Sequence, residues 1–342
     1  MRRLVTVDNG ERGGISVIVA VMMVALLGFA ALAMDVGMLY AERAQLQNGA
    51  DAAALGVAQK CASNEADPQC TGTSALAAEL LNKNALDGLS NVKSLTVDKP
   101  NRRVTAVGGA QETGKPANQV SLFLSGVFGT TSTEVNAKTT VEWGSPSKGT
   151  TPFPLAISVC QVQGMVDGAA QLLRSHSDTT ADDCRPTGPS GALVPGGFGW
   201  IVQDPGVCGG YIDVALNKGG SDTGNNGPVN CDAVLNGWAA ELTAGRDVVV
   251  LLPVFLSVTG TGSGASYDVE SFAAFKVKGW KFSGGTTLPL NFRNTSTEAG
   301  SLACTGDCRG IIGQFIKYVS LTDGYVLGAV SPYGATVVQL KS

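Results

Sequence analysis

The sequence predicts an α+β protein: a long N-terminal transmembrane helix extends into a small α+β unit, and a mainly β, disulfide-containing exported domain follows. Three observations predict this fold class. An unbroken apolar run lies near the N-terminus, a helical pattern without proline follows it, and eight cysteines all lie beyond the run. The 342 residues are 44% hydrophobic and only 15% charged. Such a composition excludes a disordered chain and supplies enough apolar side chains for sizeable cores.

The apolar run extends from Gly13 to Met34, and Ser16 is its only polar side chain. At about 1.5 Å per residue it is about 33 Å long, which suffices for a hydrocarbon layer of about 30 Å. A cleaved signal peptide is the alternative, with residues 31–33 (Ala-Leu-Ala) as a cleavage site. The run is longer than the usual signal core of about 7–15 residues, so we expect a retained single-pass anchor.

Charges around the run predict its orientation in the cell membrane. Arg2, Arg3 and Arg12 precede it, whereas Asp35 and Glu42 follow it. Because basic residues remain on the cytoplasmic side, residues 1–12 are expected in the cytoplasm and the C-terminal part outside.

The helical pattern continues through residues 35–60 as a narrow stripe of small and apolar residues. Leu39, Leu46 and Ala53 recur at seven-residue spacing, which predicts one apolar face on an otherwise polar helix. Two interpretations stay open: the stripe packs on the exported part of the same chain, or it forms an assembly surface for a partner helix.

Residues 12–58 resemble the N-terminal module of TadE/TadG-like proteins, which belong to the assembly machinery of Flp-type (tight adherence) pili. The resemblance rests on Arg12-Gly13-Gly14 before the run, Asp35-Val36-Gly37 after it, Tyr40, and above all the stretch QLQNGADAAAL at 45–55. More loosely, segments 154–160, 196–200 and 252–255 resemble exported regions of TadG-related proteins. The resemblance implies a membrane-anchored structural or accessory component of pilus assembly, with TadE-like proteins, pilin and the lipid bilayer as partners.

One departure from processed pilins is visible. Pilins that a prepilin peptidase cuts usually carry a glycine at the cut and a glutamate five residues later, whereas Ile18 and Val19 stand at those places after Gly13 and Gly14. We therefore expect no cleavage, and an anchored accessory component more than a pilin of the shaft.

The exported part is expected to divide into a small α+β unit at 61–145, a Gly/Ser/Pro-rich linker at 146–153 and a β-rich domain at 154–342. In the small unit the patterns predict a helix at 73–86, a hairpin of strands 94–98 and 102–107, a short helix at 118–128 and a strand at 133–143. In the β-rich domain they predict strands at 248–258, 267–282, 311–321 and 336–340. A β-sandwich or an irregular β-domain is favoured over a barrel.

Eight cysteines on an exported chain indicate a disulfide framework. Sequence alone leaves 105 connectivities open, and local pairs are the simplest: Cys61–Cys70, Cys160–Cys184, Cys208–Cys231 and Cys304–Cys308. A zinc site is disfavoured because no C-x-x-C pair occurs and His176 is the only histidine.

Neither composition nor motifs indicate an enzyme. No GxSxG, HExxH, P-loop or dinucleotide fingerprint occurs, no cofactor is indicated, and the 24 basic residues form no run for nucleic acid. Two functions remain: the structural component of pilus assembly described above, or a tethered extracellular binding or adhesin-like module.

Overall fold

The structure is a computed structural model, and it describes residues 12–122, 129, 131–163, 167–175, 184, 196–216, 219–222, 228–260, 265–320 and 324–341. The chain divides into two compact units. The first comprises residues 1–141 together with 340–342, and the second comprises residues 142–339.

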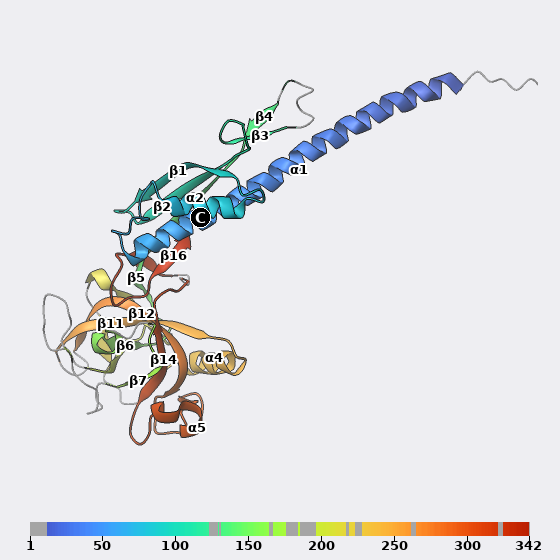
Figure 1. Cartoon of the computed structure of the whole chain (residues 1–342). Coiled ribbons are helices and arrows are strands. Elements are labelled where there is room, and N and C mark those ends of the chain that lie inside the picture. The colour runs from blue at the N-terminus through green and yellow to red at the C-terminus, as the bar shows by residue number, and fades with distance from the viewer. Residues whose placement is uncertain are drawn as a thin grey trace, which may run out of the picture. The chain divides into compact units, whose positions relative to one another are not determined.

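One long helix, α1 (Arg12–Ser63), dominates the first unit (Figure 1). Its 52 residues contain no proline, so nothing interrupts the hydrogen bonds over a length of about 78 Å. The apolar run and the segment after it are therefore one helix, as predicted.

A short helix and a hairpin follow α1 in the first unit. Helix α2 (Ala75–Asn84) buries Ala77 and Leu81. Strands β1 (Ser90–Asp98) and β2 (Arg103–Ala110) pair antiparallel across a tight turn. The predicted helix and hairpin are both present, and α1 with α2 and the hairpin gives the first unit its α+β character.

The predicted helix at 118–128 is wrong in its described part. Strand β3 (Gln119–Ser121) pairs with β4 (Ser132–Glu134), and residues 123–128 lie outside the described residues. Val120 is buried between its two polar neighbours, so alternation, and not helical spacing, decides the local structure.

The stretch predicted as a linker is largely a strand. Strand β5 (Asn136–Thr150) pairs through its later residues with β9 (Tyr211–Asp213) and β15 (Val326–Gly328). Partner strands that are distant in the sequence form hydrogen bonds with the backbone of this Gly/Ser/Pro-rich segment. Local composition does not reveal this pairing. The boundaries of the exported parts stay a prediction.

The second unit is built on one large sheet with the order β10-β8-β6-β11-β12-β14-β7. Its long central strands, β11 (Val248–Thr259) and β12 (Ser266–Lys281), form an antiparallel pair as predicted. The other elements are β6 (Leu155–Ser158), α3 (Val159–Val162), β7 (Gln171–Arg174), β8 (Phe198–Ile201), β10 (Gly219–Asp222), β13 (Asn291–Phe292), α5 (Ser296–Ala299), β14 (Gly310–Ile316) and β16 (Val337–Leu340).

The preference for a sandwich or irregular domain over a barrel needs correction. Strand β10 pairs with both β8 and β12, so the strands β10, β8, β6, β11 and β12 close into a hydrogen-bonded ring. Gly219 and Gly220 permit this closure, because a Cβ at Gly220 would lie 2.9 Å from a methyl of Val202. The mainly β character of this unit is as predicted.

Aromatic side chains and helix α4 (Asp232–Thr243) fill the core of this unit. The Phe153 ring lies 5.1 Å from the rings of Trp238 and Phe282, and 5.9 Å from that of Trp200, between ring centroids. Trp238 belongs to α4, which the sequence analysis did not predict. These contacts fix α4 on the sheet.

Candidate functional site

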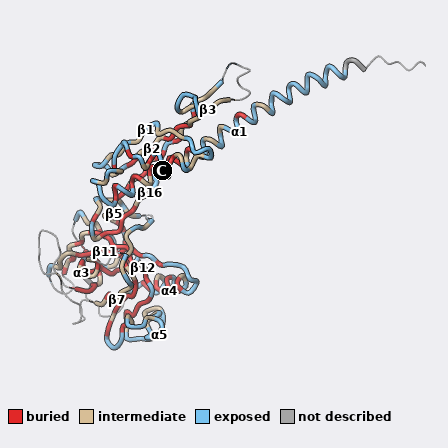
Figure 2. Tube along the Cα trace, viewed as in Figure 1, coloured by how far each residue is buried: buried red, intermediate tan, exposed pale blue. Residues whose placement is uncertain are grey.

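Residues 15–34 of α1 are exposed, apart from the half-buried Ala31 (Figure 2). Its large apolar side chains are 50–72% exposed and are not covered by any part of the chain that the structure describes; the Phe29 side chain, for example, is 72% exposed. Over 18 residues the mean hydropathy reaches 2.8. By length and composition this is a helix that can cross a membrane, and lipid would remove its apolar surface from water.

Both predicted ends of the span can be placed. Gly13 lies in the first turn of α1, which begins at Arg12. Met34 is exposed, whereas the next residue, Asp35, is only 2% exposed. Asp35 is thus the first buried residue of α1, residues 36–38 are exposed again, and regular burial of one face begins at Leu46.

The second half of α1 is buried along one face. Leu46, Ala50, Ala53 and Val57, here called the buried stripe, are 0–2% exposed. Leu46 and Ala50 share a cluster with residues of β2, β3 and β5, and Leu39 is only partly buried against it. Leu46 and Ala53 thus fit the interpretation that the helix packs on its own chain. An assembly role for Leu39 stays a prediction.

A close approach of α1 and α2 depends on a glycine. A Cβ at Gly49 would lie 3.0 Å from a methyl of Leu81 and 3.3 Å from its Cα atom. The obstacle is backbone as well as side chain, so a larger residue would push the helices apart. The glycine of the QLQNGADAAAL stretch therefore has a packing role.

Polar residues of the same stretch connect α1 to other segments of the first unit. The Gln47 amide donates to the Asp51 carboxylate and to the Thr139 hydroxyl, both at 2.8 Å, and the Thr139 hydroxyl also bonds Asp51. The Gln45 side chain accepts from the backbone N–H of Leu86 at 2.7 Å. Stripe and polar bonds together attach the second half of α1 to its unit.

These polar bonds were missed from the sequence, although a signal existed. Gln47 and Asp51 are four residues apart, the spacing at which two side chains meet on a helix surface. The spacing does not reveal the third partner, Thr139, which is distant in the sequence and belongs to β5.

Four disulfides join the eight cysteines in the local pairs expected from the sequence. Cys61–Cys70 ties the last turn of α1 to the loop before α2. Cys208–Cys231 fastens the start of α4, and Cys304–Cys308 closes a loop whose Gly306 carbonyl accepts from Lys281. In a chain exported to an oxidising compartment these cross-links stabilise the fold by restricting the unfolded chain.

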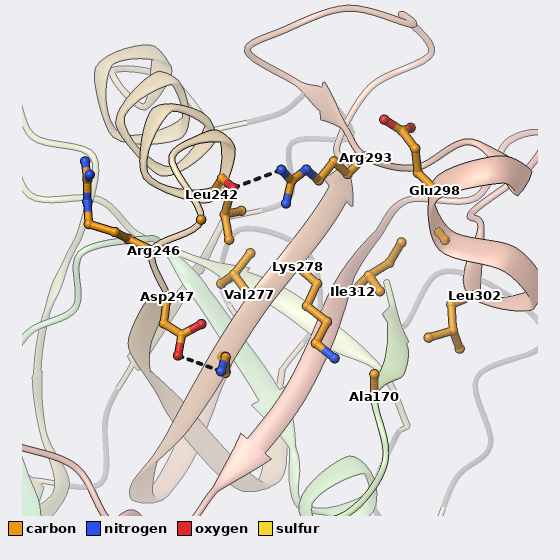
Figure 3. Close-up of a pocket in the computed structure, with 13 residues that line it drawn as sticks. Ala170, Leu242, Arg246, Asp247, Val277, Lys278, Arg293, Glu298, Leu302 and Ile312 are labelled. Atoms are coloured by element: carbon orange, nitrogen blue, oxygen red, sulfur yellow. Dashed lines mark hydrogen bonds and ion pairs between the residues drawn. The ribbon is translucent and has the colours of Figure 1, made fainter.

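A polar pocket of about 540 Å³ lies in the second unit between α4, β12, β14 and α5 (Figure 3). Its charged groups are mostly paired. Lys276 bonds Asp247 at 2.6 Å, Arg293 donates to the Leu242 carbonyl at 2.8 Å, and Glu298 caps α5. Arg246 points away from the other labelled side chains. The interactions fix the end of α4 and leave Lys278 as the cation without a partner among the described residues.

Groups that could hold a metal ion were sought in the part of the chain that the structure describes. It contains no cluster of three or more His, Cys, Asp or Glu side chains suited to a metal ion. His176 lies outside the described residues.

The geometry defines a class of protein: one helix of membrane-spanning length continues into an α+β unit, and a disulfide-bonded, mainly β unit follows. Residues 13–60 match the family model described as putative Flp pilus-assembly TadE/G-like. The match confirms the resemblance seen in the sequence, and it covers α1 almost completely. Residues 13–60 are thus similar to a pilus-assembly TadE/G-like module. Neither a curated protein nor a solved structure matches the chain.

The three segments of looser resemblance lie beside one another in the large sheet. Segments 154–160, 196–200 and 252–255 contain or overlap β6, β8 and β11, which are neighbours in the order β8-β6-β11. Leu155 pairs with Trp200, and Ile157 with Val254. Their relation to TadG-related proteins stays a prediction.

Proposed function

We propose that the protein is a single-pass, membrane-anchored structural or accessory component of Flp-type pilus assembly, and that both units lie outside the membrane. One observation carries the proposal. The TadE/G-like match covers the exposed apolar half of α1 and also the half that is fixed to the first unit. The module is thus a membrane anchor that is rigidly joined to a folded unit. A component that holds other parts of an assembly in position at the cell surface requires such a joint.

The orientation follows from charge. Arg2, Arg3 and Arg12 precede the apolar run closely, whereas the nearest basic residue after it, Arg43, stands nine residues beyond Met34. This asymmetry favours a cytoplasmic N-terminus. The four disulfides support the same orientation, because they persist in oxidising surroundings.

Protease treatment of spheroplasts tests the orientation with the full chain. We expect digestion of the cysteine-containing units and protection of the N-terminal segment. Protection of both units in intact spheroplasts, with digestion only after lysis, would contradict the orientation.

The role in pilus assembly is tested by purification from native membranes. The full chain should retain TadE-like proteins or pilin after mild crosslinking, and deletion of its gene should reduce surface pili. A matched control replaces residues 13–34 by another single-pass helix and keeps both units. Equal retention by wild type and control would assign the interaction to the exported units instead of the span.

The N-terminus of the mature chain gives a separate test. Because neither Gly13 nor Gly14 is followed by glutamate at the fifth position, residues before Gly13 should remain in the mature protein. An N-terminal sequence starting at Gly14 or Ile15 would instead indicate processing as in a pilin.

A binding or adhesin-like module is the second candidate, and one observation favours it. Valines and a tyrosine around the Cys208–Cys231 disulfide are exposed: Val202, Val207, Tyr211 and Val229. Exposed apolar side chains close together are common at binding surfaces. A ligand retained by the full chain, and lost on replacing Val202 and Val229 by serine, would support this alternative.

A further inference from the structure

A groove lies on α1 immediately after the apolar run. Its α1 wall consists of Val36, Leu39, Tyr40 and Arg43, and residues 133–136 form the opposite wall. The volume is about 480 Å³. The four α1 residues follow the i, i+3, i+4, i+7 spacing that places them on one face of the helix. We call this site the exit groove, because it begins two residues after Met34.

The depth of the exit groove corresponds to the lipid headgroups. At 1.5 Å per residue the Cα atoms of Tyr40 and Arg43 lie about 9 Å and about 14 Å beyond Met34 along the helix. The headgroup layer extends about 5–8 Å on each side of the hydrocarbon core. Helical side chains lean toward the helix N-terminus, here toward the bilayer. The long side chains of Tyr40 and Arg43 can therefore extend back toward that layer.

The groove has the chemistry that a phospholipid headgroup requires. Val36, Leu39 and Val135 supply apolar surface for the glycerol and upper acyl region. Tyr40 is 73% exposed, and an exposed aromatic ring with a polar end is characteristic of membrane interfaces. The planar guanidinium of Arg43 matches a phosphate group with two parallel hydrogen bonds.

The charges of the groove leave Arg43 available. Glu134, the acidic residue of the groove, forms an ion pair with Lys93. Arg43 is exposed and forms no ion pair with any residue that the structure describes. A phosphate would supply the missing anionic partner.

We propose that the exit groove binds a phospholipid headgroup, with Arg43 on the phosphate and Tyr40 at the membrane interface. This contact would hold the first unit at the membrane surface at a fixed depth. The proposal rests on the proposed function only in requiring that α1 spans the bilayer. It does not depend on the orientation, because the N-terminal half of α1 is the embedded half in either case.

Photo-crosslinking of the full chain in phospholipid nanodiscs tests the proposal. The nanodiscs contain phosphatidylethanolamine and phosphatidylglycerol, and a benzoylphenylalanine replaces Tyr40, Leu27 or Asn48 in turn. Leu27 lies in the span and reports on the span itself. Asn48 is exposed on the same helix, about 21 Å beyond Met34, and is the matched control outside the headgroup layer.

We expect lipid adducts at positions 27 and 40 and none at position 48. Arg43→Glu should lower the adduct at position 40 by about fivefold or more, the change that one basic residue near an anionic membrane surface produces. Arg43→Lys should retain most of the adduct, and the adduct at position 27 should not change in either variant.

Two results would overturn the proposal and still leave the membrane span supported. One is an adduct of position 40 with a second copy of the chain in place of lipid. The other is a lipid adduct at position 40 that Arg43→Glu leaves unchanged. Absence of a lipid adduct at position 27 would instead contradict the membrane span, and with it the proposed function.

Discussion

The two halves of α1 form one continuous helix in opposite surroundings. Between Ile15 and Met34 the side chains are apolar apart from Ser16, many are large, and all but the half-buried Ala31 are exposed. Between Leu46 and Ala62 the buried positions are mostly alanines. A lipid environment requires apolar character and adapts to any side-chain size. A folded unit requires side chains that fit one fixed space, and small residues allow α2 and the sheet to approach the helix.

This difference explains why the two halves are recognised by different signals. Hydropathy identifies the first half, since Ser16 is the only polar side chain between Gly13 and Met34. In the second half hydropathy is low, and the identity of individual residues matters: Gly49 for the approach of α2, and Asp51 for the bond to Thr139. The same substitution is therefore expected to act differently in the two halves.

The largest expected effect comes from a charge placed in each half. Ala53→Asp puts a carboxylate without a partner at a fully buried position and should cost about 3–5 kcal/mol of unfolding free energy. Ala25→Asp should leave the unfolding of the first unit in detergent unchanged. In membranes it should reduce insertion, at a cost of about 2.5–3.5 kcal/mol.

Unfolding in detergent, followed by protease resistance of the first unit, measures the first effect, and membrane fractionation measures the second. Asn48→Asp is the control, because Asn48 is exposed on the same helix. Equal destabilisation by Ala53→Asp and Asn48→Asp would contradict the burial of the stripe.

Leucine truncation separates the halves with a smaller effect. Leu46→Ala removes a side chain that is 2% exposed and should destabilise the first unit by about 2–4 kcal/mol. Leu27→Ala removes an exposed one and should change the unfolding free energy by less than about 0.5 kcal/mol. Denaturant titration in detergent compares the two. A similar loss in both variants would show that the first half also packs on protein.

Much of the fold could be predicted from the sequence because its signals are local. The apolar run, the continuous helix, the β1–β2 hairpin and the pairing of cysteines close in sequence all depend on residues near one another. Helix α4 had a signal that was overlooked. Leu235, Trp238, Ala239 and Leu242 follow the helical spacing.

Other features depend on partners distant in the sequence. Strand β10 closes the ring of five strands only because β12 pairs with its two glycines and β8 pairs with Ser221 and Asp222. The later half of β5 is a strand because β9 and β15 pair with it. The exit groove likewise requires residues 133–136 beside α1. A glycine-rich or proline-containing segment gives no local indication of such pairing.

Glycine replacement should have opposite effects on stability at Gly49, in the second half, and at Gly37, just beyond the first half. At Gly49 a Cβ would meet the Leu81 backbone, so Gly49→Ala should destabilise the first unit by about 1–3 kcal/mol. At Gly37 nothing lies within 4 Å of the new Cβ, so Gly37→Ala should be neutral or stabilise the helix by up to about 1 kcal/mol. Thermal unfolding in detergent tests both variants, and the same sign for both would contradict the close approach of α2.

Glu42 lies between the two halves, and its protonation makes the stability of the first unit depend on pH. Partial burial, and then the nearby carboxylates of Asp87 and Glu112, raise the pKa of Glu42 above its ordinary value of 4.5. The folded state therefore holds this proton more tightly than the unfolded state does. The resulting stabilisation is complete below pH 4.5 and is lost as the pH rises toward the raised pKa of the folded state.

The smallest expected effect follows from the raised pKa of Glu42. Glu42→Gln should stabilise the first unit at neutral pH by less than about 1 kcal/mol, because water screens a half-exposed group, and the gain over wild type should disappear below pH 4.5. Glu79 on α2 is the opposite case: its hydrogen bond with Lys83 lowers its pKa, so Glu79→Gln should weaken the unit slightly at neutral pH. Thermal unfolding at pH 4 and pH 7 compares both variants with wild type. A Glu42→Gln gain that is equal at both pH values would show that the side chain acts through packing and not through its proton.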